Sequence, residues 1–209
     1  MQILDEEGAV LPTGQMGAIA IRLPLPPGCL PTLWNAPERF RQAYLARYPG
    51  YYLTGDAGYR DEDDYVYVMS RIDDVINVAG HRLSTGAIEE VLASHKDVAE
   101  CACIGVADEL KGELPMGLVV LKAGVAREPE AIRRELVAKV RDEIGPVAAF
   151  KLVAVVKRLP KTRSGKILRG TMKKLADDAE LKVPATIDDP LILDEVREEL
   201  RALGYARRG

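Results

Sequence analysis

Aromatic side chains are scarce in this sequence: Trp, Tyr and Phe together make up 5% of the residues, with one Trp and two Phe. Aliphatic side chains must therefore build the core. Apolar types reach 47% of the chain and charged types 29%, which are the proportions of an ordinary soluble globular protein. They exclude a wholly disordered or collagen-like chain, and 209 residues suffice for one full domain or for a small domain with part of another.

A charge excess of either sign is also missing. The 29 basic and 32 acidic residues leave a formal net charge of −3, so the bulk charge does not favour nucleic acid or a membrane surface as a partner. No stretch approaches the roughly 20 apolar residues of a membrane-spanning helix, and the N-terminus lacks the basic start and apolar run of a secretory signal. We expect a cytoplasmic protein, or one of the mitochondrial matrix in a eukaryote, that contacts neither membrane nor nucleic acid.

Cysteine is rare, with three residues and no CxxC pair. An odd number without that spacing fits neither a disulfide framework nor a zinc site, and Cys101 and Cys103 lie in an apolar run that suits core thiols. His81 and His95 are far apart in the sequence and have no acid or thiol at ligand spacing. The sequence predicts a reduced, intracellular protein without a metal site of its own.

The chain divides near residue 72, and residues 1–72 carry too few elements for a self-sufficient core. Three strands and one helix are predicted there, at Ala18–Leu23, Tyr51–Tyr59, Tyr65–Ser70 and, for the helix, from an Asn35 N-cap to Pro49. This part is interpreted as the β-rich C-terminal remnant of a larger N-terminal domain.

Residues 73–180 have the pattern of a compact α/β unit, and residues 181–209 that of a helical tail. The predicted elements are a hairpin over 75–85, helices over Gly86–Ser94, Glu128–Ile144 and Ile167–Ala176, strands over Cys101–Val106, Met116–Leu121 and Lys151–Val156, and a tail helix over Asp188–Leu203. The predicted fold class is α+β: a small C-terminal α/β lobe with a central, mostly antiparallel sheet and flanking helices.

The segment from Lys157 to Lys174 holds eight Lys or Arg residues and no acid. Thr162, Ser164 and Gly165 make its loop polar and bendable, so Lys166 can be presented on a mobile arm. An ammonium group delivered to a phosphate or carboxylate can neutralise the charge that develops in phosphoryl or nucleotidyl transfer. The alternative interpretation is a solvated basic loop or a patch for RNA.

Two other segments combine charge with glycine. Asp56 lies between glycines at a strand end, where a carboxylate can accept hydrogen bonds from a ribose diol; a turn aspartate that satisfies its own backbone is the alternative. Arg71 and Arg82 flank the predicted domain junction at Asp73, and an arginine fork suits phosphate and ribose. Surface salt bridges are the alternative for these arginines.

Taken together, these segments resemble the C-terminal third of an AMP-forming acyl-CoA synthetase of the adenylating superfamily, and in particular the short-chain acetyl-CoA and propionyl-CoA synthetases. The matching stretches occur in the family's order: LPPGCLPTLWNAPERF, YYLTGDAGY, SRIDDVINVAGHRL followed by IEE, VADELKGELP, RDEIGPVAAF and LPKTRSGKILRG. The resemblance spans nearly the whole chain, and PKTRSGK joined to DDVINVAGHR is a highly specific pair.

The resemblance implies an acid–thiol ligase that uses ATP, CoA and Mg²⁺ in two half-reactions. A carboxylate first attacks the α-phosphate of ATP, and the CoA thiol then displaces AMP after the small C-terminal domain has rotated. The implied roles are the adenylation lysine for Lys166, ribose binding for Asp56, nucleotide contacts for Arg71 and Arg82, the pivot for Asp73, pantetheine contact for Ala79 and Gly80, and CoA nucleotide contact for Arg141. Lysine acetylation and deacetylation enzymes that act on Lys166 are implied partners, because acetylation removes the charge.

The family's Gly/Ser/Thr-rich phosphate loop, acyl pocket and magnesium-binding glutamate lie N-terminal to everything in this sequence. We therefore predict that the chain alone is inactive, and that the missing N-terminal domain and a short-chain carboxylic acid are its partners. The segment LPPGCLPTLW and the TIDDP tail favour propionate slightly over acetate or longer acids. The alternatives are a stand-alone accessory module that binds CoA or a partner without catalysis, and a basic RNA-binding module.

Overall fold

The computed structural model describes residues 1–207, and the chain divides into two compact units after Asp73. Unit 1 is Met1–Asp73 and unit 2 is Asp74–Gly209. The predicted boundary near residue 72 lies within two residues of this division. Residues 208 and 209 of the predicted tail lie outside the described residues.

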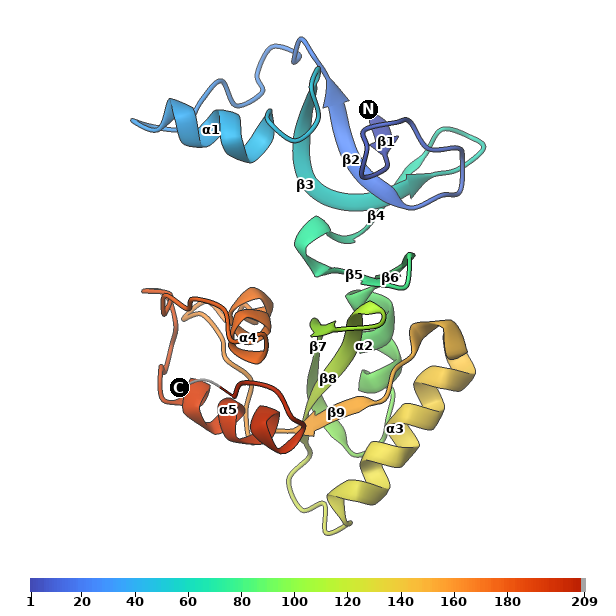
Figure 1. Cartoon of the computed structure of the whole chain (residues 1–209), viewed down its shortest axis with the longest axis vertical. Helices are drawn as coiled ribbons and strands as arrows, with labels where there is room; N and C mark the ends of the chain where they lie inside the picture. The colour runs from blue at the N-terminus through green and yellow to red at the C-terminus, as the bar shows by residue number, and fades with distance from the viewer. Residues whose placement is uncertain (208–209) are drawn as a thin grey trace. The chain divides into compact units, whose positions relative to one another are not determined.

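Unit 1 is a four-stranded antiparallel sheet with one helix. Its strand order is β1-β2-β3-β4, so chain order and spatial order coincide (Figure 1). The elements are β1 (Gln2–Leu4), β2 (Gly17–Arg22), α1 (Pro37–Tyr44), β3 (Tyr51–Arg60) and β4 (Val66–Arg71). The sequence interpretation missed β1, because three residues are too few for a periodic pattern.

The start of α1 differs from the prediction. Asn35 has φ +49°, in the left-handed region, and Ala36 is the N-cap, without a side-chain capping hydrogen bond. Pro37 then occupies the first turn, where a missing N–H costs nothing. The helix ends at Tyr44, well before Pro49, and the predicted asparagine cap is therefore wrong.

The core of unit 1 is small. One cluster joins Leu4, Ala18, Ala20 and Tyr48, and two of its four members are alanines. Strand β4 forms an edge of the sheet and exposes much of its apolar surface, with Val68 at 65% exposure.

Unit 2 contains a five-stranded sheet between two pairs of helices. The sheet order is β6-β5-β8-β7, with β9 also paired to β8; every pairing is antiparallel except β8–β9, which is parallel. The elements are β5 (Val75–Val78), β6 (His81–Ser84), α2 (Thr85–Ala93), β7 (Val98–Asp108), β8 (Gly112–Leu121), α3 (Pro129–Glu143), β9 (Leu152–Val155), α4 (Arg169–Ala176) and α5 (Ile192–Ala202). The mostly antiparallel sheet with flanking helices confirms the predicted fold class.

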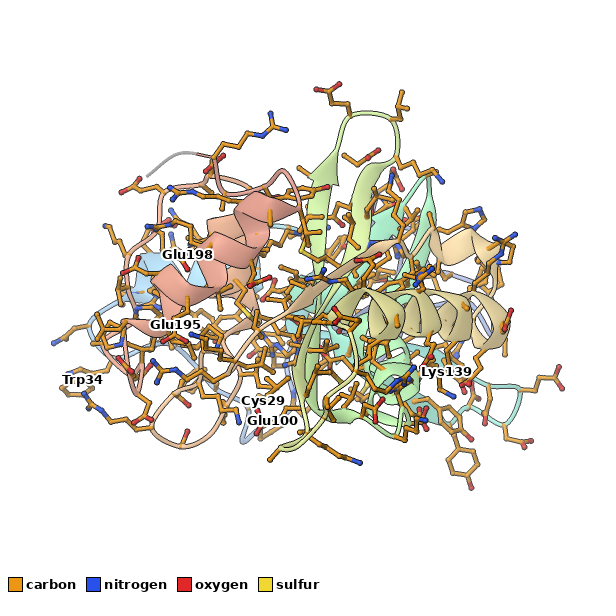
Figure 2. The ribbon with its side chains drawn as sticks, turned by 90° about the horizontal axis from the view of Figure 1, so that it is seen from below. Cys29, Trp34, Glu100, Lys139, Glu195 and Glu198 are labelled. Carbon is orange, nitrogen blue, oxygen red and sulfur yellow. The ribbon has the colours of Figure 1, made fainter. Side chains whose placement is uncertain are left out.

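Helices α2 and α3 pack on one side of this sheet, and α4 and α5 on the other (Figures 1 and 2). Glu195 of α5 and Lys139 of α3 accordingly lie on opposite sides of the strands in Figure 2. The periodicity of α3 explains its place, because Ile132, Leu136 and Val140 are spaced by four and all three are fully buried.

The C-terminal tail belongs to the same core. Ile192, Val196 and Leu200 of α5 are buried in the cluster that also holds Leu118 of β8 and Met172 of α4. The sequence interpretation set residues 181–209 apart as a helical tail, whereas the structure packs the described part of that tail into unit 2.

The outer edge of β7 is covered by side chains from neighbouring helices. Glu89 of α2 accepts a hydrogen bond from the Cys103 N–H (2.8 Å), and Asp177, at the end of α4, accepts one from the Ala107 N–H (2.9 Å). Because unpaired edge N–H groups invite pairing with another strand, these carboxylates close the sheet against aggregation. Among the described residues, no helix is both long and apolar enough to cross a membrane.

Candidate functional site

In unit 1, the antiparallel pairing of β3 with β4 places Asp56 directly opposite Arg71. Arg71 Nη1 donates to Asp56 Oδ1 at 3.4 Å, and the side chains are 57% and 37% exposed. A pair as open as this adds little to stability. It does present a carboxylate and a guanidinium side by side to solvent, which is the donor and acceptor set that a ribose diol and a phosphate require.

Gly55 allows this arrangement. Its φ is +88°, which L side chains rarely adopt, and a Cβ there would lie 2.9 Å from Arg71 Nη2. The guanidinium therefore lies against the bare backbone of β3. Thr54 fixes the same turn, since its hydroxyl donates to the Ile19 carbonyl (2.8 Å) and accepts from the Asp56 N–H (3.2 Å).

Asp73, the predicted pivot, is the last residue of unit 1. It lies in a short 3₁₀ turn, Ile72–Asp74, and its side chain is 84% exposed, with Oδ2 4.0 Å from Arg71 Nη2. An exposed side chain in a single turn leaves the backbone few contacts to break if its dihedral angles change. The structure thus places Asp73 where the compact units divide.

In unit 2, the predicted pantetheine contacts Ala79 and Gly80 form the tight turn between β5 and β6. Both have positive φ, +49° and +89°, as the two central residues of a type I′ hairpin require. Asn77 Oδ1 accepts from the Gly80 N–H at 3.0 Å, and a Cβ on Gly80 would meet nothing within 4 Å. Arg82 lies on β6, opposite Asn77 of β5, and is two residues from the turn.

Glu113 of β8 connects this hairpin to α4. Its Oε2 accepts from the Asn77 backbone N–H at 2.9 Å, while its Oε1 forms an ion pair with the ammonium group of Lys173. Sequence interpretation missed Glu113, which is one of many acids in a charged chain. Only the stretch VADELKGELP, in which it lies, gave any signal.

The Lys166 loop, residues 161–167, is a hydrogen-bonded turn. The Thr162 N–H donates to the Lys166 carbonyl (2.8 Å), the Gly165 N–H donates back to the Thr162 carbonyl (2.8 Å), and the Lys166 N–H donates to Thr162 Oγ1 (3.1 Å). Gly165 has φ +84°, which explains the glycine. The Lys166 side chain is exposed, and its ammonium group has no ion pair or hydrogen bond within residues 1–207.

The opening of α4, three residues after Lys166, is fixed by an ion pair that the sequence interpretation missed. Arg169 donates through Nε and Nη2 to the two carboxylate oxygens of Glu89, both at 2.8 Å. Such a two-bond fork fixes orientation as well as distance.

Burial, together with Glu89, raises the pKa of the adjacent Cys101 thiol to about 11, so this thiol stays protonated and unreactive near neutral pH.

Arg141, in the last turn of α3, lines an open cavity of about 480 Å³. Three more cations line it, Arg133, Arg134 and Lys151, with Glu130 as the one acid among its lining residues. The volume is that of a small-molecule site. The excess of positive charge suits an anionic ligand such as the nucleotide end of CoA.

Within the part of the chain that the structure describes, no three His, Cys, Asp or Glu side chains come together as ligands for a metal ion. His95 has a different role. It is buried and lies 3.0 Å from Glu135 through Nε2, while Nδ1 accepts from the Asp97 N–H (3.2 Å). Both ring nitrogens thus serve the packing of α2 against α3.

These features are those of the small C-terminal domain of an adenylating enzyme, and comparison with known proteins agrees. Residues 87–166 match the AMP-binding enzyme C-terminal domain family. The chain is 60% identical over 201 residues to an uncharacterized protein of Pseudomonas aeruginosa, covering 96% of this chain and 32% of that protein.

Two relatives with assigned names give the narrower class. The chain is 51% identical to acyl-CoA synthetase short-chain family member 3, mitochondrial, of Mus musculus, and 43% identical to acetyl-coenzyme A synthetase of Pyrobaculum aerophilum. The alignments cover 96% and 97% of this chain, but only about 30% of either relative. The chain is homologous to the C-terminal part of AMP-forming acyl-CoA synthetases, as its motifs indicated.

Solved structures of adenylating enzymes have the same fold. The amide bond synthetase McbA from Marinactinospora thermotolerans matches with a TM-score of 0.64 and 32% identity, over 83% of this chain and 34% of that one. ATP-bound MatB from Rhodopseudomonas palustris matches with a TM-score of 0.67 and 25% identity, over 83% and 33%.

Proposed function

We propose that this chain supplies the moving, lysine-bearing part of a short-chain acyl-CoA synthetase. In the reaction, a carboxylate oxygen attacks the α-phosphate of ATP and pyrophosphate leaves. The thiol of CoA then attacks the acyl carbonyl of the acyl-adenylate, loses its proton, and AMP leaves. The observation that carries the proposal is the exposed Lys166, which has no ion-pair partner among residues 1–207 and lies on a hydrogen-bonded turn, in a chain 51% identical to a named short-chain acyl-CoA synthetase.

Lys166 would act in the first step. Its ammonium group would bridge a carboxylate oxygen and an α-phosphate oxygen, and so stabilise the negative charge shared between them in the transition state. A charge presented by a fixed backbone needs no reorganisation as the reaction proceeds. Arg82 would reach a phosphate oxygen of the same nucleotide.

In unit 1, Asp56 would accept hydrogen bonds from the ribose hydroxyls and Arg71 would donate to the nucleotide. Their exposure and their fixed pairing across β3 and β4 support these roles. Asp73 would be the pivot between the two steps. These groups bind and orient ATP, while magnesium would have to be held by residues outside this chain, and no step here depends on it.

For the second step, the Ala79–Gly80 turn would lie along the pantetheine arm of CoA and Arg141 would meet its nucleotide. The open space beside Gly80 allows a ligand to approach the backbone closely. The cationic cavity beside α3 supports the second contact.

The acid would be a short-chain carboxylate, in line with the name of the mouse relative, and the segments LPPGCLPTLW and TIDDP favour propionate. The exposed ammonium group of Lys166 would also be open to an acetyltransferase, and acetylation would remove the charge that adenylation requires. Because the mouse relative is named as mitochondrial, we keep both the cytoplasm and the mitochondrial matrix as predicted compartments for this chain.

A chimera tests the proposal. The C-terminal part of the Pyrobaculum aerophilum acetyl-coenzyme A synthetase would be replaced by this chain, and carboxylate-dependent ATP–pyrophosphate exchange would be measured with acetate, propionate and butyrate. We expect exchange from the chimera and none from the chain alone. Lys166→Ala should lower exchange about 100- to 1,000-fold, whereas Lys174→Ala, which removes an exposed lysine of α4, should leave it unchanged.

Two results would contradict the proposal. Exchange by the isolated chain would show that a complete site lies within these residues. Full exchange by the Lys166→Ala chimera would remove the lysine from the reaction. If the chain alone binds CoA while the chimera folds but does not react, the accessory-module alternative would be favoured instead.

A further inference from the structure

The Lys166 loop lies against a segment of the C-terminal tail that the matched family domain, residues 87–166, does not include. The Arg163 N–H donates to the Thr186 carbonyl at 3.0 Å, and the Asp188 N–H donates to the Lys161 carbonyl at 2.9 Å. Thr162 and Ile187 form an antiparallel bridge between them. Residues 186–188, here called the brace, thus pair with the loop as a short strand would.

The brace is itself fixed in unit 2. Ile187 is 4% exposed and belongs to the main core cluster. Directly after the brace, Asp189 Oδ2 forms an ion pair with Arg158 Nη1 at 2.7 Å, and Arg158 Nη2 also donates to Glu195 Oε1 of α5 at 2.9 Å. The brace is therefore held by the core on one side and by an ion-pair network on the other.

The loop has few other supports. Its four internal hydrogen bonds, including the one between the Thr162 and Ser164 hydroxyls, close the turn but do not fix its position relative to the sheet. Lys161 does this in part through its ion pair with Glu100 at 2.7 Å, an exposed pair of the kind that contributes little. The brace supplies the backbone hydrogen bonds that connect residues 161–163 to a buried side chain.

We propose that the brace is a positioning element, which holds the backbone of the Lys166 loop so that the ammonium group reaches the reacting oxygens in one geometry. The inference rests on the proposed function of Lys166 and extends it to residues 186–189. A long lysine side chain amplifies small backbone movements, and a displacement of about 1 Å at a reacting group can cost about 100-fold in rate. Loss of the brace should therefore lower the rate of adenylation without removing the lysine.

The structural part of the proposal can be tested on this chain by hydrogen exchange. Ile187→Ala should accelerate exchange at the Arg163 and Asp188 amides by about tenfold or more, because their acceptors move away. The amides of β7 and β8 should keep their protection. Leu191→Ala, a 69% exposed leucine of the same tail, is the matched control and should change neither.

A milder variant covers the case in which Ile187→Ala unfolds unit 2. Asp189→Asn keeps the shape of the side chain and an acceptor for the Leu191 N–H, but removes the charge that faces Arg158. It should accelerate exchange at the same two amides by a smaller factor. Unchanged exchange at both amides in a folded Ile187→Ala variant, or equal acceleration throughout unit 2, would contradict the proposal that the brace holds the Lys166 loop.

Kinetics of the chimera test the functional part. Ile187→Ala should lower kcat of ATP–pyrophosphate exchange about 10- to 100-fold and leave KM for ATP nearly unchanged, because the nucleotide-binding residues proposed in unit 1 are intact. Ile187→Val should restore most of the rate. Formation of acyl-CoA from added acyl-adenylate should change little, since Lys166 acts in the first step.

Failure of this inference and failure of the proposed function give different results. If exchange at the two amides responds but kcat does not, the brace is structural only and the positioning role is wrong. If Lys166→Ala retains full activity while the amides still respond to Ile187→Ala, the proposed function fails, and the positioning of a catalytic lysine fails with it.

Discussion

The two units of this protein differ in how much apolar surface they bury. The core cluster of unit 2 joins 32 buried residues from every layer, whereas that of unit 1 joins four. Unit 1 also leaves a row of apolar side chains on β4 exposed. Unit 1 therefore has much less buried apolar surface to keep it folded than unit 2.

The candidate groups follow the same division. Those of unit 1, Asp56 and Arg71, lie on adjacent strands and depend on one register. In unit 2, Ala79, Gly80 and Lys166 lie on two turns that several supporting residues hold in place, while Arg82 lies on β6 and Arg141 on α3. Four predictions follow from this comparison, and hydrogen exchange measured in urea would assign each effect to a unit.

The largest effect is expected from truncation of a core leucine in each unit. Leu136→Ala and Leu4→Ala should each remove about 2–5 kcal/mol, since both side chains are fully buried. Unit 2 should remain folded. Unit 1 should unfold, because a single hydrophobic core in a unit below roughly 70–80 residues rarely supplies more than about 3–5 kcal/mol. Leu110→Ala, at a 95% exposed position, is the control and should change stability by less than about 0.5 kcal/mol. Full protection of β2 and β3 in Leu4→Ala would contradict the comparison.

Alanine at Gly55 or at Gly80, one positive-φ glycine from each unit, should cost about 1–2 kcal/mol through backbone strain. Gly80→Ala should add no further loss of stability and leave KM for ATP unchanged, because its Cβ would contact no other protein atom. Gly55→Ala should in addition displace the Arg71 guanidinium, and in the chimera should therefore raise KM for ATP. Asparagine tolerates this backbone region better, so Gly80→Asn should recover part of the loss. Equal KM values for ATP in Gly55→Ala and Gly80→Ala would show that Arg71 takes no part in nucleotide binding.

Glu113→Gln should lower the stability of unit 2 by about 0.5–1 kcal/mol, because the amide oxygen can still accept from the Asn77 N–H but loses its charge toward Lys173. The hairpin amides near Gly80 should exchange faster. Glu143→Gln breaks the surface pair with Lys139 of α3, labelled in Figure 2, and serves as a matched control with an effect of about 0.5 kcal/mol or less. Unchanged exchange of the hairpin amides in Glu113→Gln would show that the ion pair with Lys173 of α4 does not support the hairpin.

The smallest effect is a pH dependence confined to unit 2. Hydrogen bonds from Arg127 and then His95 lower the pKa of Glu135 to about 2, from its ordinary value of 4.5. Since the folded-state pKa is the lower one, the stabilisation is complete above the ordinary value and is lost as the pH falls from about 5 to about 2. Urea unfolding at several pH values would measure this slope, and Glu135→Gln should flatten it. An unchanged slope in Glu135→Gln would assign the acid sensitivity to other carboxylates.

Most elements could be predicted from periodicity, because their apolar faces repeat with a helix or strand spacing. Helix α3 is the clearest case. The errors lie where local signals compete: Asn35 and Glu38 suggest an N-cap three residues before an acid, yet the backbone turns left-handed at Asn35 and the helix begins after Ala36. Strand β1 was missed because only its pairing with β2 makes it a strand.

The candidate site divides in the same way. Lys166, Asp56 and Arg71 were found because their neighbours in sequence are distinctive. Glu89, Glu113 and the brace were missed, since each acts on a partner far away in the chain. Arg169, for example, is paired with Glu89, 80 residues before it. A local sequence pattern cannot predict a pairing between residues so far apart along the chain.

The amino-acid sequence by itself determined the division near residue 72, the apolar faces of the helices and strands, the turns that need glycine, and the homology to AMP-forming acyl-CoA synthetases. These depend on residue type and spacing along the chain. Only the tertiary structure decided which carboxylates support the Lys166 segment, that the tail enters the core of unit 2, and that the brace pairs with the Lys166 loop. Those contacts join residues distant in sequence, and only the packing of the sheet and helices brings them together.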